Sequence, residues 1–151
     1  MKKTILLGTL LFTLISTQSF AGWKDMISEE VKASFRHEFV DAEDVQWEDS
    51  GSFIKVSFKL ASQSLSAYFD AEGNLLAVTR YISPDHLPIH LLLLLRAKYP
   101  DYWITDLLEM NNGQYSTYFA AINNGDKEVM LKSIGDGNWH VVRKTRITTR
   151  K

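Results

Sequence analysis

The feature that most constrains the fold is a series of elements that occurs twice: one amphipathic helix, then four short alternating segments. In the first series, Val31, Phe35 and Phe39 recur every four residues and predict a helix over residues 28–39. Apolar and polar side chains then alternate, as in strands with one buried face, over residues 45–48, 54–60, 65–69 and 76–82. The short turns between these segments predict antiparallel pairing.

The second series begins where Pro84 and Pro88 end the fourth segment. A helix is predicted from Pro88 to the residue before Pro100, and it contains five consecutive leucines at 91–95. Four further strands are predicted over residues 103–110, 115–122, 127–134 and 139–147. In the strand at 115–122, odd-numbered and even-numbered residues compete for the core, so alternation alone leaves its buried face open.

We interpret the two series as an internal duplication, with repeat one at about residues 25–82 and repeat two at about 84–147. The predicted fold is α+β: a tandem duplication of a helix plus four-stranded antiparallel sheet unit, with the helices packed on one face of the sheet. Because about 60 residues are few for an independent core, we expect the repeats to share one, either as a continuous eight-stranded sheet or as two sheets that meet at an edge. The leucine run leaves no polar side, so we expect the second helix to be covered on most sides and Leu93→Asp to prevent folding.

The first 21 residues have the pattern of an export signal. Lys2 and Lys3 precede an apolar run of about 11 residues, and the small residues Ser19 and Ala21 suit a signal peptidase. We expect cleavage after Ala21, which leaves residues 22–151 as a single domain. The apolar run is too short to span a bilayer, so we expect no transmembrane segment in the mature chain. The absence of cysteine excludes a lipoprotein anchor and disulfides, and a periplasmic or secreted location follows.

Histidine positions do not fit known metal motifs. His37 lies on the first predicted helix, but a zinc protease would need its second histidine where Asp41 stands. His86 and His90 have helical spacing, yet Pro88 between them marks the helix start and leaves His86 outside the regular turns. The serines lack a nearby histidine to activate them. We therefore predict a chain that is not an enzyme and has no metal and no cofactor.

The charged residues also restrict the function. The whole chain has 17 Lys+Arg against 18 Asp+Glu, a balance that argues against a nucleic-acid binder. An acidic cluster could in principle bind calcium, but it lacks the central glycine of a calcium loop. We predict instead a solvated acidic edge that discourages pairing between sheets. Its members are Asp41, Glu43, Asp44, Glu48 and Asp49.

Aromatic side chains are the remaining candidates for a binding surface. The helices can cover only one face of the predicted sheet, so some of the strand aromatics must lie on the other face. Tyr68 and Tyr81 are the best candidates, because their strand neighbours of opposite parity are apolar enough to be buried. Trp103 also lies on a predicted strand. Tyrosine and tryptophan dominate protein interfaces, so we predict that these three residues bind a partner.

Three short motifs accompany the repeated architecture: Leu87-Pro88 before the second helix, Tyr99-Pro100 after it, and Phe69-Asp70-Ala71-Glu72-Gly73 at the third hairpin. Over about residues 25–147 the chain resembles the β-lactamase-inhibitor-like, PepSY-like family of exported bacterial proteins. This resemblance implies a concave, aromatic-rich antiparallel sheet that grips an enzyme, with an acidic hairpin tip entering the enzyme's site. By this resemblance Asp49, at the first hairpin, joins the predicted partner-binding residues.

The sequence therefore predicts an exported, non-catalytic binding module whose partner is another exported protein. Inhibition of an extracytoplasmic enzyme through the exposed sheet face is one form of that function. The alternative is a small-ligand carrier or sensor domain with a pocket between the repeats. An exposed aromatic patch on the sheet would favour the first function, and a closed apolar pocket between the repeats would favour the second. The sequence leaves the partner's identity and the oligomeric state open.

Overall fold

The computed structural model describes residues 27–134 and 137–147, and the predicted export signal lies outside these ranges. The helices in this part of the chain are α2 (Glu29–Glu38), the short 3₁₀-helix η1 (Pro84–His86) and α3 (Ile89–Lys98). The strands are β1 (Glu43–Asp49), β2 (Ile54–Leu60), β3 (Gln63–Phe69), β4 (Leu75–Tyr81), β5 (Trp103–Asn111), β6 (Ser116–Asn123), β7 (Lys127–Ile134) and β8 (Asn138–Arg146). Within the described ranges, no helix has the length and apolar character needed to span a membrane.

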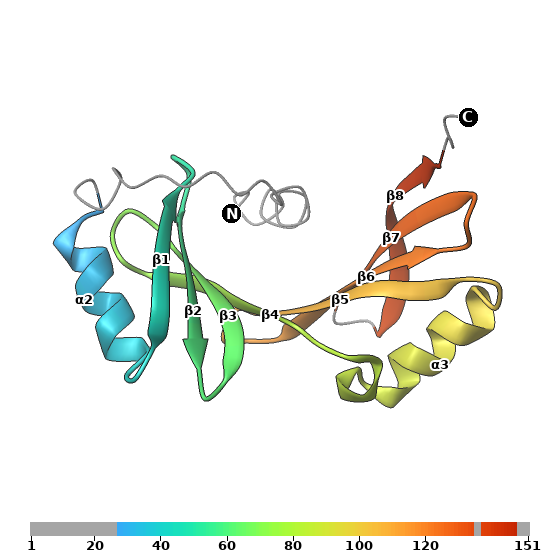
Figure 1. The fold of residues 1–151 in the computed structure, drawn as a ribbon, viewed down its shortest axis with the longest axis horizontal. Helices are drawn as coiled ribbons and strands as arrows, with labels where there is room; N and C mark the ends of the chain where they lie inside the picture. Colours follow the sequence, from blue (N-terminus) through green and yellow to red (C-terminus); the bar gives the residue numbers. More distant parts are fainter. Residues whose placement is uncertain (1–26, 135–136, 148–151) are drawn as a thin grey trace.

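The eight strands form one antiparallel sheet in which the strand order follows the chain order from β1 to β8 (Figure 1). Strands β4 and β5 join the two halves through a seam of four paired positions, from Val78 opposite Asn111 to Tyr81 opposite Leu108. The predicted α+β class with an antiparallel sheet is confirmed. The tandem duplication of a four-stranded unit stays a prediction.

Both helices lie on the same face of the sheet. Val78 of β4 packs against the apolar cluster beneath α2. Arg80, two residues further along β4, points to the same side and is paired with Glu109 of β5. Leu107, two residues before Glu109, packs in the cluster beneath α3. The opposite side, called the open face below, carries neither helix (Figure 1).

Helix α2 begins near the residue that the sequence predicts. Ser28 is the N-cap, and its hydroxyl accepts a hydrogen bond from the backbone N–H of Val31 at 3.4 Å. Glu29 and Glu30 place negative charge in the first turn, where the helix dipole favours it. The buried side chains of Val31 and Phe35 then pack on apolar residues of β2 and β3. The apolar stripe of the sequence is therefore the contact between α2 and the sheet.

Helix α3 corrects the expectation drawn from the leucine run. Leu91, Leu92 and Leu95 are buried against the sheet, but Leu93 and Leu94 are exposed. The helix has only one neighbouring layer among the described elements, because it lies on the outer side of β5–β8 (Figure 1). A single layer can bury only one side of a helix. The prediction that the sheet and the other half of the chain cover α3 on most sides is therefore wrong.

Replacing Leu93 with aspartate is accordingly expected to leave the fold intact, contrary to the prediction from sequence. The new carboxylate would lie in water, so the free energy of unfolding should change by no more than about 1 kcal/mol. A urea titration followed by circular dichroism checks this. Loss of the folded state in Leu93→Asp would mean that the outer side of α3 is covered in the protein.

The expectation of one shared core is also wrong. Buried apolar residues form one cluster beneath α2 and a separate cluster beneath α3. In β6, the even-numbered residues Tyr118, Ala120 and Ile122 belong to the cluster beneath α3. Phe119 points to the open face and is nevertheless buried, with the Lys132 ammonium 5.5 Å from its ring centroid. Both faces of β6 are buried, so apolar residues occur at odd-numbered and even-numbered positions alike. For this reason alternation could not show which residues face the helices.

Polar side chains separate the two clusters on the helix-bearing face of the seam. Arg80 Nε donates a hydrogen bond to Glu109 Oε2 at 2.8 Å, across β4 and β5. Ser116 and Tyr118 donate hydroxyl hydrogen bonds to Glu109 Oε1 at 3.1 and 3.3 Å. Burial by itself raises the pKa of Glu109, but the Arg80 hydrogen bond, the Ser116 hydrogen bond and the Arg80 charge together hold that pKa below its ordinary value.

The Glu109 network predicts a pH-dependent contribution to stability. The pKa of Glu109 is lower in the folded chain than in the unfolded chain, so its stabilising contribution is present at neutral pH and is lost as pH falls through the folded-state pKa. Glu109→Gln should lower the free energy of unfolding by about 1 to 3 kcal/mol at pH 7. Urea titrations at pH 7 and below pH 4 should show the difference from wild type shrinking in acid. A difference that is the same at both pH values would contradict this account.

Candidate functional site

A row of small polar side chains crosses the open face of the first four strands. The register places Gln46 opposite Ser57, Ser57 opposite Ser66, and Ser66 opposite Thr79. Paired residues of neighbouring strands point to the same face, so these four side chains form a line perpendicular to the strands. Larger side chains stand in the adjacent rows, Lys55 and Tyr68 on one side and Lys59 and Tyr81 on the other. The row of Gln46, Ser57, Ser66 and Thr79 lies between these two rows of larger side chains, and we call it the trough.

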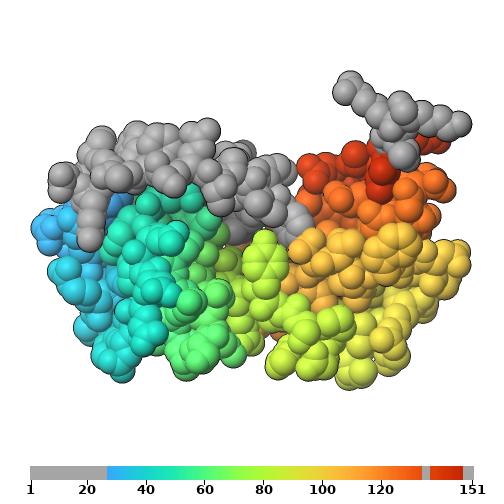
Figure 2. All heavy atoms as spheres, in the orientation of Figure 1, coloured from blue at the N-terminus to red at the C-terminus, as the bar shows by residue number. Residues whose placement is uncertain are grey.

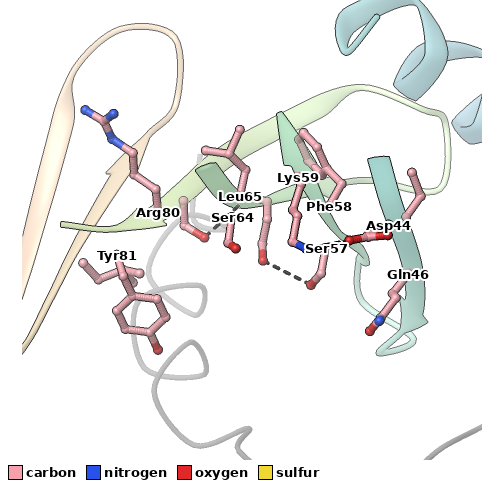
Figure 3. A pocket seen from close by; sticks show the side chains of 13 residues that line it. Asp44, Gln46, Ser57, Phe58, Lys59, Ser64, Leu65, Arg80 and Tyr81 are labelled. Carbon is pink, nitrogen blue, oxygen red and sulfur yellow. Dashed lines mark hydrogen bonds and ion pairs between the residues drawn. The ribbon is translucent and has the colours of Figure 1, made fainter. Parts of the chain in front are cut away.

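The trough forms the floor of a hollow of about 610 Å³ (Figure 3). The Ser57 and Ser66 hydroxyl oxygens are 3.2 Å apart, and the Thr79 hydroxyl reaches the Ser66 carbonyl at 3.5 Å. The described residues that line the hollow belong to β1–β5 and are mostly polar. This lining differs from the closed apolar pocket between repeats that would favour the carrier or sensor alternative. The hydroxyl groups can donate and accept hydrogen bonds, so the trough can hold a neutral polar group.

Two ion pairs join β1 to β2. One lines the hollow, and the other lies next to it. Lys59 Nζ lies 2.7 Å from Asp44 Oδ2, and Lys55 Nζ lies 3.3 Å from Glu48 Oε2. The hydrogen bond to Asp44, followed by its negative charge, raises the pKa of Lys59. The predicted acidic edge is exposed as expected, but lysines of β2 balance these two acids. The β1 side of the site is therefore charged, whereas the trough is neutral.

The two predicted tyrosines both point to the open face but differ in accessibility. Tyr81 is 63% exposed and lines the hollow, and in Figure 3 its ring points away from Arg80, on the opposite side of β4. Tyr68 is only 4% exposed, so the expectation that it lies in solvent is wrong. The Phe53 ring packs edge-on against it at 5.5 Å between centroids, and Ala77 completes that cluster. Burial raises the pKa of Tyr68 to about 12.

The other two predicted residues lie apart from the trough. Trp103 is exposed and is paired with Asn123, at the end of β5 away from the seam. Asp49 is paired with Ile54, whose side chain belongs to the cluster beneath α2, so Asp49 does not share the open face. Its carboxylate instead accepts a hydrogen bond from the backbone N–H of Gly51 at 2.7 Å, within the hairpin turn. Tyr68, Tyr81 and Trp103 therefore share the open face, with Trp103 far from the two tyrosines, and Asp49 does not share it.

The trough presents hydroxyl groups that can form hydrogen bonds with a polar group. In the described ranges, no group of three or more His, Asp or Glu side chains could hold a metal ion. The trough residues were not predicted, because each is an ordinary polar strand residue when read singly. Only the register of three strand pairs places Gln46, Ser57, Ser66 and Thr79 in one line. Serines at matching positions in consecutive hairpin strands were the available signal.

Comparisons with solved structures find the same fold in bacterial proteins. A BLIP-like protein from Bacteroides fragilis matches with a TM-score of 0.65 and 17% identity, over 82% of this chain and 89% of that one. A DUF2874 family protein from Bacteroides uniformis matches with a TM-score of 0.68 and 13% identity, over 82% and 92% of the two chains. A protein from Bacteroides eggerthii, described as a candidate periplasmic protein, matches with a TM-score of 0.68 and 12% identity, over 80% and 89%.

No family model matches the chain, and no curated protein matches it significantly. Sequence identities this low between structural neighbours show a common fold and leave function to be argued separately. The resemblance to the β-lactamase-inhibitor-like family is confirmed for the fold, and its PepSY-like part stays a prediction. This chain has the fold of a BLIP-like protein and of DUF2874 family proteins from Bacteroides.

Proposed function

We propose that this protein is an exported, non-catalytic module that binds another exported protein with the open face of its sheet. The observation that carries the proposal is that both helices cover one face, while the open face bears the trough and the exposed ring of Tyr81. A rigid sheet with an aromatic anchor beside hydrogen-bonding groups is suited to a protein interface. The candidate periplasmic and BLIP-like neighbours support export and a binding role.

The finer form of the proposal is inhibition of an extracytoplasmic enzyme. A loop of that enzyme would lie in the trough, where Ser57 and Ser66 offer hydroxyls to its backbone and side chains. Tyr81 would pack against the loop from one side. Adding the mature protein to a purified β-lactamase and measuring hydrolysis of a chromogenic substrate tests this form. If the β-lactamase keeps its full activity when the mature protein is in excess, that enzyme is not the partner. Other exported proteins then remain candidates for the capture experiment.

The proposal is tested first by capture and then by measured affinity. Tagged residues 22–151 would be incubated with periplasmic extract from the native host, and each captured protein would be purified. Calorimetry should show that Tyr81→Ala weakens binding by about tenfold to thirtyfold, since a well-packed aromatic anchor contributes about 2 kcal/mol. The fold should survive, because this side chain is exposed.

Leu93→Ala is the matched control, since Leu93 is similarly exposed but lies on α3, on the other side of the sheet. Its affinity for the captured partner should equal that of wild type. If Leu93→Ala weakens binding and Tyr81→Ala does not, the partner binds the helix-bearing face and the proposed surface is wrong.

A further inference from the structure

The outer side of α3 is mostly apolar although it faces away from the sheet, and the exposed His90 lies one turn before Leu94 on this side. Ile89 is 68% exposed, Leu93 59% and Leu94 42%, and Ala97 is exposed one turn after Leu93. Successive turns of a helix place residues four apart side by side, so Ile89, Leu93 and Ala97 form a line with Leu94 beside it. We call these four residues the outer stripe. Figures 1 and 2 show α3 at the surface of the molecule.

Helix α2 shows that the fold itself does not require such a stripe. It has the same length as α3 and also lies on the helix-bearing face. Yet the exposed residues of α2 include Glu29, Arg36 and His37, which are polar. A helix in this layer can therefore pack on the sheet without exposed leucines, as α2 does. Exposed apolar patches of a few hundred Å² commonly mark an interaction surface.

The charges around the outer stripe are unequally distributed along α3. Arg96 and Lys98 lie in the last turn and outnumber Asp101 just beyond it, whereas Asp85 lies in η1, just before the helix begins, with His86 Nδ1 3.4 Å from its carboxylate. All five side chains are exposed. Two such helices packed antiparallel would bring the basic end of each toward the acidic end of the other. Antiparallel packing also opposes the two helix dipoles favourably, whereas parallel packing would place like charges together.

We propose that the outer stripe binds the same stripe of a second copy, with the two α3 helices antiparallel across a two-fold axis. Leu93 lies near the centre of the stripe and would meet its equivalent near the axis, as in an isologous interface. A contact between one pair of short helices is small, near the lower limit of about 1,000 Å² for specific interfaces. The dimer is therefore in equilibrium with the monomer. It leaves both open faces free, so it is independent of the proposed function.

The test is sedimentation velocity of the mature protein, residues 22–151, from about 1 µM to about 1 mM, a range that covers weak association. Wild type should shift from monomer to dimer across this range. Leu93→Asp should raise the dimer dissociation constant at least about tenfold, because it places two carboxylates near the axis. The matched control is Val40→Asp, which changes a similarly exposed apolar side chain just after α2 and should dimerise as wild type does. Circular dichroism confirms that each variant is folded.

Charge exchange tests the antiparallel arrangement. Asp85→Lys and Lys98→Glu should each weaken dimerisation, because each brings like charges together, and the double variant should restore it. Wild type that remains monomeric throughout, or Leu93→Asp that dimerises as wild type does, would overturn the proposal. Dimerisation that Val40→Asp weakens equally would also overturn it. If neither single charge variant weakens the dimer, the antiparallel arrangement is wrong.

Discussion

Replacing Phe35 with alanine is expected to lower the free energy of unfolding by about 3 to 5 kcal/mol, the range for large aromatic deletions in a core. Phe35 is buried on α2, and its ring centroid lies 5.1 Å from that of Phe58, 5.2 Å from that of Trp47 and 5.4 Å from that of Phe39. Removing the ring leaves a cavity that touches the helix and two strands. Because small domains are stable by about 5 to 15 kcal/mol, this loss removes a large share of the free energy of unfolding.

A urea titration followed by circular dichroism measures the effect. His37→Ala is the matched control on the same helix, since His37 is exposed and lies outside this cluster, and it should change stability by less than about 0.5 kcal/mol. A loss below about 1 kcal/mol in Phe35→Ala would show that the cluster beneath α2 does not hold the first half together.

The second large effect is expected at Trp139, which connects β8 to α3. Its indole Nε1–H donates a hydrogen bond of 2.8 Å to the backbone carbonyl of Leu91, and the ring is buried in the cluster beneath α3. Trp139→Ala should lower the free energy of unfolding by about 3 to 5 kcal/mol through lost packing and a cavity. Trp139→Phe keeps most of the apolar surface but lacks the donor, so its cost should be about 1 to 2 kcal/mol.

The graded series is the discriminating measurement for Trp139. Val142→Ala on the same strand is the control, because Val142 is exposed and its truncation should have little effect. Equal losses in Trp139→Ala and Trp139→Phe would mean that the hydrogen bond to Leu91 accounts for the whole contribution. Stability unchanged in both variants would show that β8 is not needed to cover α3.

Helices and strands could be predicted from the sequence where the apolar residues followed a single period. The four-residue spacing of Val31, Phe35 and Phe39 located α2, and alternation located the strands, because each element buries one side. The leucine run of α3 misled us because composition does not reveal how many layers surround a helix. The polar contact between Arg80 and Glu109, which separates the two apolar clusters, joins residues 29 positions apart and has no local signature.

The candidate site was predicted only in part. Alternation correctly placed Tyr68 and Tyr81 on one face of the sheet, because parity determines the direction of a strand side chain. Parity cannot determine exposure, and the ring of Phe53 buries Tyr68. Asp49 was assigned by resemblance alone, and the structure shows its carboxylate in a turn. The trough depends on register across four strands, which hairpin lengths alone do not fix.

The strand order also has a consequence for how the chain folds. Each strand pairs with the one synthesised just before it, so closing a strand pair requires only a short loop everywhere except between β4 and β5, where η1 and α3 intervene. Low sequence separation between contacts favours rapid folding for a sheet of this size. A chain that crosses a membrane with its N-terminus first could complete β1–β4 and the cluster beneath α2 before β5 emerges. The second half would then grow outward from β4: β5 would pair with it after η1 and α3 have emerged, and β6 to β8 would follow one hairpin at a time.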